Sequence, residues 1–313
     1  MKRILSVLLI VLVFLSLFGC AGETAETAEN KATAETKENP ESNPPEDFEY
    51  KELDDGTIKV WYIGKDQERV VFPETIDGKT VTATYTMLPV ENNTVCSVHL
   101  PNTITEIGPA TFEKWTALEE IHLPSSLTQI GMRAFMECTS LKSIEIKSSC
   151  LTKRSEECFV NSGLETVILS DEITYIPNTC FAQTKIRQIV MPKSLKEIGR
   201  GAMGGCTELE MIVLNEGLLT IGDNAFIGSL KLKEIIIPES VKSISELAFV
   251  QCANLEKVKF EGDAPDYQID DAVLKAIYED DLSEKTANYT VCYREGAVGF
   301  TSPEWCGHPT EIW

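Results

Sequence analysis

The stretch LPSSLTQIGMRAFMECTSLKSIEI (123–146) determines the architecture, because versions of it return along the chain every 22 or 23 residues. A close copy is IPESVKSISELAFVQCANLEKVKF (237–260). Self-similarity at a period of about 20–29 residues is typical of a solenoid, in which each unit buries its apolar face against its neighbours. We therefore expect a stack of similar coils. Proteins built this way usually bind something along their length.

Each copy contains the pattern L-x-x-I-x-I, whose last two apolar residues lie on one face of a short strand. The residue between them lies on the opposite face. The final position of the pattern is apolar in eight successive places: Leu100, Leu123, Ile146, Leu169, Met191, Leu214, Ile237 and Phe260. One strand per repeat predicts a parallel sheet with about 4.8 Å between strands. Proline directly after the strand, as at Pro124 and Pro238, ends it because proline cannot donate to the ladder.

Two further features complete each repeat. An apolar pair such as Leu127 and Ile130, often followed by Gly, predicts a second, shorter strand. We interpret the Ala-Phe element after it as a single helical turn whose side chain fills the interior. Its large residues are Phe112, Phe135, Phe159, Phe181, Met203, Phe226 and Phe249. The expected fold is thus a β-rich leucine-rich repeat solenoid with seven repeats over 101–260.

The consensus L-x-x-I-x-[IL]-P-x-x-[LV]-x-x-I-G-x-x-A-F-x-x-C resembles the BspA-like class of bacterial leucine-rich repeats. This resemblance implies an N-terminal cap with an incomplete repeat at 48–100 and a C-terminal cap at 261–313. Within the C-terminal cap, DDAVLKAIYED (270–280) has helical spacing. Members of this class are mostly secreted or surface proteins that bind host or matrix components, or that have no assigned role.

The third repeat (147–169) departs from the consensus. At the positions where the consensus of the other repeats has Ile, Gly and Ala, this repeat has Arg154, Ser155 and Cys158. An unpaired Arg is too costly to bury in an apolar interior. We therefore expect Arg154 to turn outward and the stack to be kinked or loosened there.

The N-terminus has the layout of a secretory signal peptide over 1–19: Lys2 and Arg3, then an apolar run from 4 to 18. A membrane-spanning anchor is disfavoured, because that run is shorter than the roughly 20 residues needed to cross a bilayer. Leu17-Phe18-Gly19-Cys20 resembles the bacterial lipobox, which implies lipidation of Cys20. Residues 20–47 then predict an acidic disordered tether, with 8 acidic and 2 basic residues between 21 and 47.

The sequence offers little for catalysis or metal binding. It contains three widely separated histidines and no Cys-x-x-Cys or phosphate-cradling motif, so we expect a non-catalytic protein without metal or cofactor. Most of the ten cysteines lie in or beside interior columns, which favours buried thiols over a disulfide framework. Cys158 with Cys180, and Cys292 with Cys306, are placed where they could pair, and both pairings stay open. The net charge of −21 disfavours nucleic acid as a partner.

One surface feature is a candidate binding site. The outward strand positions are aliphatic in four successive repeats, with a methionine beside them, and we name these residues the aliphatic stripe: Ile168, Val190, Met211, Val213 and Ile236. Apolar surface rimmed by polar residues marks interaction sites. The alternatives are that β-branched residues simply favour strands, or that a loop covers them.

The leading hypothesis is therefore a lipid-anchored, extracytoplasmic repeat protein that binds a protein or matrix partner, as in adhesion. A second hypothesis is a nutrient-capture lipoprotein that holds a glycan or peptide for a transporter or hydrolase. Glycan binding would favour exposed aromatic residues on the sheet, whereas the stripe is aliphatic. A third is a purely structural spacer.

Overall fold

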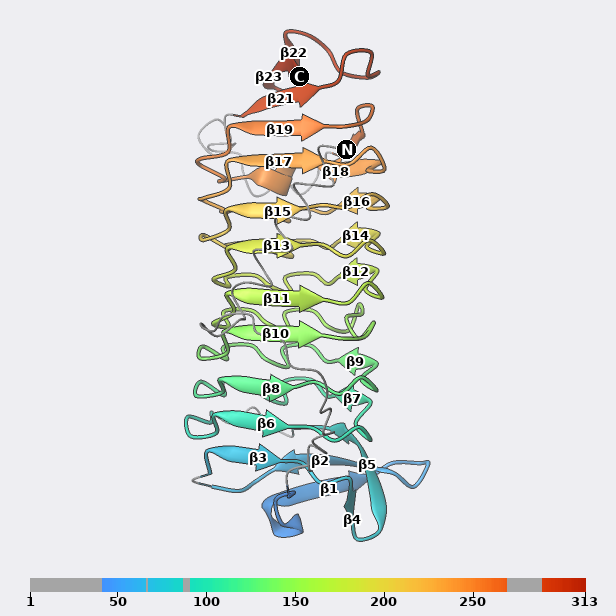
Figure 1. Ribbon diagram of the computed structural model, residues 1–313, viewed down its shortest axis with the longest axis vertical. Coiled ribbons are helices and arrows are strands. Elements are labelled where there is room, and N and C mark those ends of the chain that lie inside the picture. Colours follow the sequence, from blue (N-terminus) through green and yellow to red (C-terminus); the bar gives the residue numbers. More distant parts are fainter. Residues whose placement is uncertain (1–40, 66, 87–90, 269–288) are drawn as a thin grey trace, which may run out of the picture. The chain divides into compact units, whose positions relative to one another are not determined.

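The computed structural model describes residues 41–65, 67–86, 91–268 and 289–313. Within them the chain winds as a parallel β-solenoid of about ten turns (Figure 1). The predicted signal segment (1–19), Cys20, the tether up to residue 40 and the helix expected at 270–280 lie outside the described residues. Among the described residues, no helix is long and apolar enough to span a bilayer.

The main strands stack one above the other, one per coil, and their inward residues are buried. Neighbours that hydrogen-bond do so in parallel register; for example, Ile144 of one strand lies opposite Val167 of the next. The series comprises β3 (Arg69–Val71), β6 (Ser97–His99), β8 (Glu120–His122), β10 (Ser143–Ile146), β11 (Thr166–Leu169), β13 (Gln188–Val190), β15 (Met211–Val213), β17 (Glu234–Ile237), β19 (Lys257–Phe260), β21 (Thr290–Tyr293) and β23 (His308–Ile312). The predicted parallel sheet is confirmed.

A second series of strands follows the main ones, also as predicted; they are two or three residues long in the repeats, whereas β2 and β5 near the N-terminal end have five and six residues. Its members pair in parallel within two ladders. They are β2 (Ile58–Tyr62), β5 (Lys79–Thr84), β7 (Glu106–Ile107), β9 (Gln129–Ile130), β12 (Tyr175–Ile176), β14 (Glu197–Ile198), β16 (Thr220–Ile221), β18 (Ser243–Ser245) and β20 (Asp266–Gln268). The remaining elements are β1 (Phe48–Glu52), β4 (Thr75–Ile76), β22 (Glu304–Trp305), and the 3-10 turns η1 (Pro45–Asp47) and η2 (Glu246–Phe249).

Stacking extends beyond the seven repeats that the sequence predicts. β3 pairs with β6 before them, and β21 pairs with both β19 and β23 after them. An antiparallel hairpin of β1 and β2 begins the described fold. The end of the predicted tether is also ordered, because the side chain of Asn43 accepts a hydrogen bond from the backbone of Val71 at 2.8 Å.

The Ala-Phe segments differ from the expected helical turns. Among the described repeats, only the one with η2 contains a 3-10 turn here. The others form pairs of tight turns, and two positions per segment adopt left-handed backbone conformations, such as Arg133 (φ 59°) and Glu137 (φ 61°). Gly201 and Gly205 occupy the same two positions three coils later, with φ of 60° and 71°.

These turns form a third ladder between coils. The backbone N–H of Phe135 donates to the carbonyl of Cys158 at 2.8 Å, and that of Phe159 donates to Cys180 at 2.9 Å. Phe181 continues the series by donating to Ala202 at 2.8 Å. A helical turn would direct the same groups along its own axis, and the next coil would lose its partners. The requirement for bonding between coils therefore overrides local helix formation.

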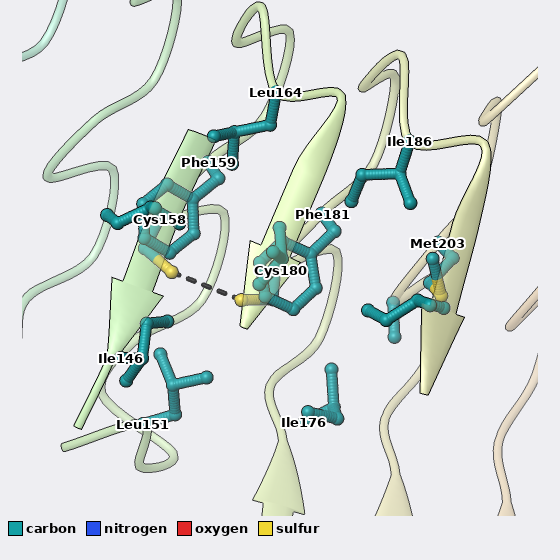
Figure 2. Close-up of a cluster of buried hydrophobic side chains, with 14 of the residues drawn as sticks. Ile146, Leu151, Cys158, Phe159, Leu164, Ile176, Cys180, Phe181, Ile186 and Met203 are labelled. Atoms are coloured by element: carbon teal, nitrogen blue, oxygen red, sulfur yellow. Dashed lines mark hydrogen bonds between the residues drawn. The ribbon is translucent and has the colours of Figure 1, made fainter. Parts of the chain in front are cut away.

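We name the large residues of the Ala-Phe segments, Met203 included, the Phe column; they stack inside the solenoid, and every one is almost fully buried. The rings of Phe135 and Phe159 lie 5.2 Å apart and are tilted by only 4°. Those of Phe159 and Phe181 lie 5.4 Å apart at 8° (Figure 2). Met203 interrupts the aromatic series. Beyond the column, Phe72 and Tyr289 pack edge-on against its first and last rings.

The third repeat is irregular, as expected, but only locally. Arg154 is exposed, and no short strand forms in this coil, so β9 and β12 belong to separate ladders. Leu151 fills the interior instead, and the buried hydroxyl of Ser155 accepts a hydrogen bond from the backbone N–H of Thr152 at 3.1 Å. The Phe stack runs through this coil without a break.

Phe159→Ala is expected to lower the free energy of unfolding by about 3–5 kcal/mol, because it removes a ring stacked on both sides and leaves a cavity. Urea denaturation followed by circular dichroism measures this loss. Ile168→Ala in the same coil is the control. It removes an exposed side chain and should change stability by less than about 1 kcal/mol. Equal losses of stability in Phe159→Ala and Ile168→Ala would contradict the stabilising role of the stacked rings.

At Glu137, glycine is expected to be tolerated better than valine by at least about 1 kcal/mol, because a left-handed backbone strains a β-branched residue. The preference should reverse at Glu145, an exposed position of strand β10, where valine favours the strand. Thermal unfolding of Glu137→Gly, Glu137→Val, Glu145→Gly and Glu145→Val measures both orders. The same order at both sites would disprove the left-handed backbone conformation assigned to Glu137.

Candidate interaction surface

The aliphatic stripe lies on the outer face of four consecutive main strands. Ile168 (β11) is 45% exposed, Val190 (β13) 36% and Ile236 (β17) 40%. Val213 of β15 is half-buried between them, and Met211 is half-buried in the adjacent outward row of the same strand. The structure therefore brings the five predicted residues together on one face, and whether a partner binds them stays a prediction.

The chain alternates sharply between the outer face and the core. Ile189 and Ile212 flank the stripe residues in sequence, yet they are 0% and 6% exposed. This alternation follows from the period of two in a strand. Because strand ladders hold the backbone, the exposed aliphatic groups occupy fixed positions and have little freedom to turn inward.

Charged residues flank the stripe. On the same outward row, Glu145 precedes it and Lys259 follows it; Glu145 pairs with Lys147 at 3.2 Å and Lys259 pairs with Glu234 at 2.6 Å. At the start of the strands, Arg187 pairs with Glu210 of the next coil at 2.7 Å. Exposed pairs of this kind contribute little to stability. They do form a polar rim around an apolar centre, which is the usual anatomy of an interface.

The outward row also brings two histidines together. His99 and His122, 23 residues apart in sequence, lie on paired strands with ring centroids 6.1 Å apart. Partial burial, together with His122 and Arg69 nearby, holds the pKa of His99 below its usual value. These two histidines are far apart in the sequence, and the fold brings them together. Within the described residues, however, no group of three His, Cys, Asp or Glu side chains could hold a metal ion.

Cys138, Cys206 and Cys252 share one position of the repeat, and we name them the cysteine column. They are buried, as the sequence predicts, and their thiols are also hydrogen-bonded. Cys138, Cys206 and Cys252 each donate to the backbone carbonyl of the Phe in the preceding coil, at 3.1 Å. Burial raises the pKa of Cys252 to about 12 and that of Cys150 to about 11. These thiols are therefore protonated and unreactive near neutral pH.

Neither candidate pair forms a disulfide bond in the structure. Cys158 and Cys180 lie in the core with their sulfur atoms 3.2 Å apart (Figure 2). Cys292 is buried with its sulfur 3.3 Å from a carboxylate oxygen of Glu311, whereas Cys306 is exposed. The sequence position alone placed the first pair correctly in adjacent coils.

Sequence reasoning missed a cavity at the N-terminal end of the described fold, with a volume of about 630 Å³. Aromatic residues form much of its lining: Trp61, Tyr62, Phe72, Tyr85, Phe112 and Trp115. Of these, only Phe112 belongs to the Phe column. The signal available in the sequence was the clustering of Trp61, Tyr62 and Tyr85 outside the repeat pattern, in the segment assigned to the N-terminal cap.

Comparison with known proteins identifies the repeat. The family model for the BspA type leucine rich repeat region matches the chain in 6 copies, over residues 91–209 and 174–268. No curated protein matches the chain.

Two solved structures are similar to the chain. One is a leucine-rich repeat protein from T. pallidum, with 25% sequence identity and a TM-score of 0.50, covering 61% of this chain and 91% of that one. The other is a leucine-rich repeat protein from Bacteroides ovatus ATCC 8483, with 20% identity and a TM-score of 0.52, covering 85% of this chain and 75% of that one. The second likeness concerns the fold alone.

Among the described cysteines, only Cys96 and Cys306 are expected to react within minutes with iodoacetamide at pH 8, because the other thiols are buried. Peptide mass spectrometry of the native chain, with a urea-unfolded sample as the control, measures the labelling. Rapid native labelling of Cys138 or Cys252 would show that the cysteine column is open to solvent.

Proposed function

Because the chain belongs to the BspA-type leucine-rich repeat family, we propose that it is a cell-surface binding protein whose aliphatic stripe contacts a protein partner, as in adhesion. The observation that carries this proposal is the row of exposed Ile168, Val190 and Ile236 on a rigid sheet. The proposed role is binding, without catalysis.

The rigid presentation of the stripe favours binding. Association costs free energy when side chains and loops must be ordered at the interface. Here the ladders have already fixed the backbone, and Ile and Val have few rotamers to lose. An aliphatic patch on such a surface can therefore contribute most of its burial to affinity.

The stripe is too small to be a whole interface. Four strands at about 4.8 Å spacing extend over roughly 15 Å, while a stable complex buries about 800 Å² on each partner. The stripe would therefore form the desolvated centre, with the charged rim around Glu145, Arg187 and Glu210 contacting the partner's periphery. Since the chain's net charge is −21, a partner with basic residues around an apolar centre is favoured.

The N-terminal segment supports a location outside the cytoplasm. We propose that the signal segment (1–19) is removed and that Cys20 carries the lipid that holds the protein to the membrane. Several acyl chains on one residue give stable anchoring. The acidic residues that follow would then separate the solenoid from the lipid surface, leaving the stripe accessible.

The double substitution Val190→Glu with Val213→Glu is expected to abolish partner capture and to leave the thermal midpoint nearly unchanged. Affinity capture from host matrix and from the cell's own envelope, with the native chain and the variant as baits, measures binding. The matched control is Thr105→Glu with Thr128→Glu, which adds the same charge at exposed positions near the short strands.

Ile189→Glu serves as a second comparison, because it places the same charge one residue away but inside the core. It should unfold the protein. A large loss of stability in the Val190/Val213 variant would show that the stripe belongs to the core. Unchanged capture by that variant would refute the stripe as the binding site.

A further inference from the structure

We propose that the N-terminal cavity is a second binding site, which takes a short, uncharged oligosaccharide. It lies among β2, the residue after β5, the 91–94 segment and the first turns of the Phe column. The stripe begins at β11, so the two sites use different coils. The cavity's volume of about 630 Å³ lies within the range of about 300–1,000 Å³ typical of small-ligand sites.

The aromatic walls suit the apolar faces of sugar rings. Trp61 is half-buried at the cavity, and its ring meets that of Tyr85 at 71°, with centroids 5.9 Å apart. Tyr62 and Trp115, which also line the cavity, meet at 62°. A pyranose has C–H faces that pack on aromatic rings and hydroxyl groups at its edge. Two rings that form a corner can contact a face and an edge of the same sugar.

The polar rim suits the hydroxyl groups. Thr86, Asn92, Asn93 and Thr94 contribute amides and hydroxyls to the lining. The side-chain oxygen of Asn92 accepts hydrogen bonds from the backbone N–H groups of Thr94 at 3.1 Å and Val95 at 2.9 Å. Its amide NH₂ is therefore the group that it can offer to a ligand. Apolar walls with a few convergent polar groups are the usual composition of such a site.

The charges favour an uncharged ligand. Among the described residues of the lining, one is Lys (Lys65) and one is Glu (Glu91). A cationic ligand is disfavoured because the ammonium group of Lys59 already lies 3.9 Å from the centroid of the Tyr85 ring. An anionic ligand is disfavoured by the chain's net charge of −21.

The backbone holds the walls in place. Asn92 forms a parallel bridge with Trp115, and its N–H donates to the carbonyl of Lys114 at 3.2 Å. At Gly64 an added Cβ would lie 2.5 Å from the hydroxyl oxygen of Tyr62, so the chain passes directly over that ring. A site formed before the ligand arrives avoids the cost of ordering it.

The test titrates the purified chain with cellotetraose, chitotetraose, maltotetraose and mannotetraose, and measures intrinsic tryptophan fluorescence. At least one sugar is expected to give a saturable change. Trp61→Ala should weaken its binding at least tenfold, as measured by isothermal titration calorimetry. Trp313→Ala, at the far end of the sequence, is the matched control and should bind like the native chain.

Each other result overturns the proposal. The proposal is overturned if none of the four sugars gives saturable binding. It is also overturned if the Trp61→Ala variant is folded and binds like the native chain. If Trp61→Ala unfolds, Asn92→Ala provides the same comparison. A proline decapeptide that binds the cavity when the sugars do not would assign it to peptide recognition, since Pro-rich segments also dock on aromatic grooves.

Discussion

The backbone hydrogen bonds between successive coils are the constraint on which the rest of the structure depends. A coil of 22 or 23 residues cannot satisfy its own N–H and C=O groups, so it must pass them to its neighbours. Main strands, short strands and the Ala-Phe turns form three kinds of ladder for this purpose, and the two strand series are each divided into shorter sheets along the stack. Three ladders keep the coils nearly equal in length, and equal length is what aligns the Phe rings inside and the stripe outside.

The same constraint explains what could be predicted from the sequence. Main strands, short strands and the Phe column were predictable, because each depends on apolar residues at fixed spacing. The left-handed turns were not, because positions such as Arg133, Glu137 and Gln183 carry residues with no special preference for that conformation. Only the glycines and asparagines in the same columns, such as Gly205 and Asn161, carried the signal.

The two candidate binding surfaces also differ in how far the sequence predicts them. The stripe follows from strand alternation, so its residues could be named from the sequence and the structure places them side by side. The aromatic cavity lies outside the repeat, where no periodicity applies, and it depends on how the β1–β2 hairpin and the 91–94 segment meet the first full coil. Trp61 and Trp115 are 54 positions apart, and only the folded chain brings them to one cavity.

Ion pairs in this molecule mostly join one coil to the next: Arg187 reaches Glu210, and Lys231 reaches Glu208. Together with the ladders, they make most contacts local along the axis, which gives the gene a simple way to change the protein. Duplicating one 23-codon unit would insert a coil without disturbing the others, and it would lengthen the solenoid by about 4.8 Å. Each coil inserted between the cavity and the stripe would thus increase the distance between the two sites by one coil spacing.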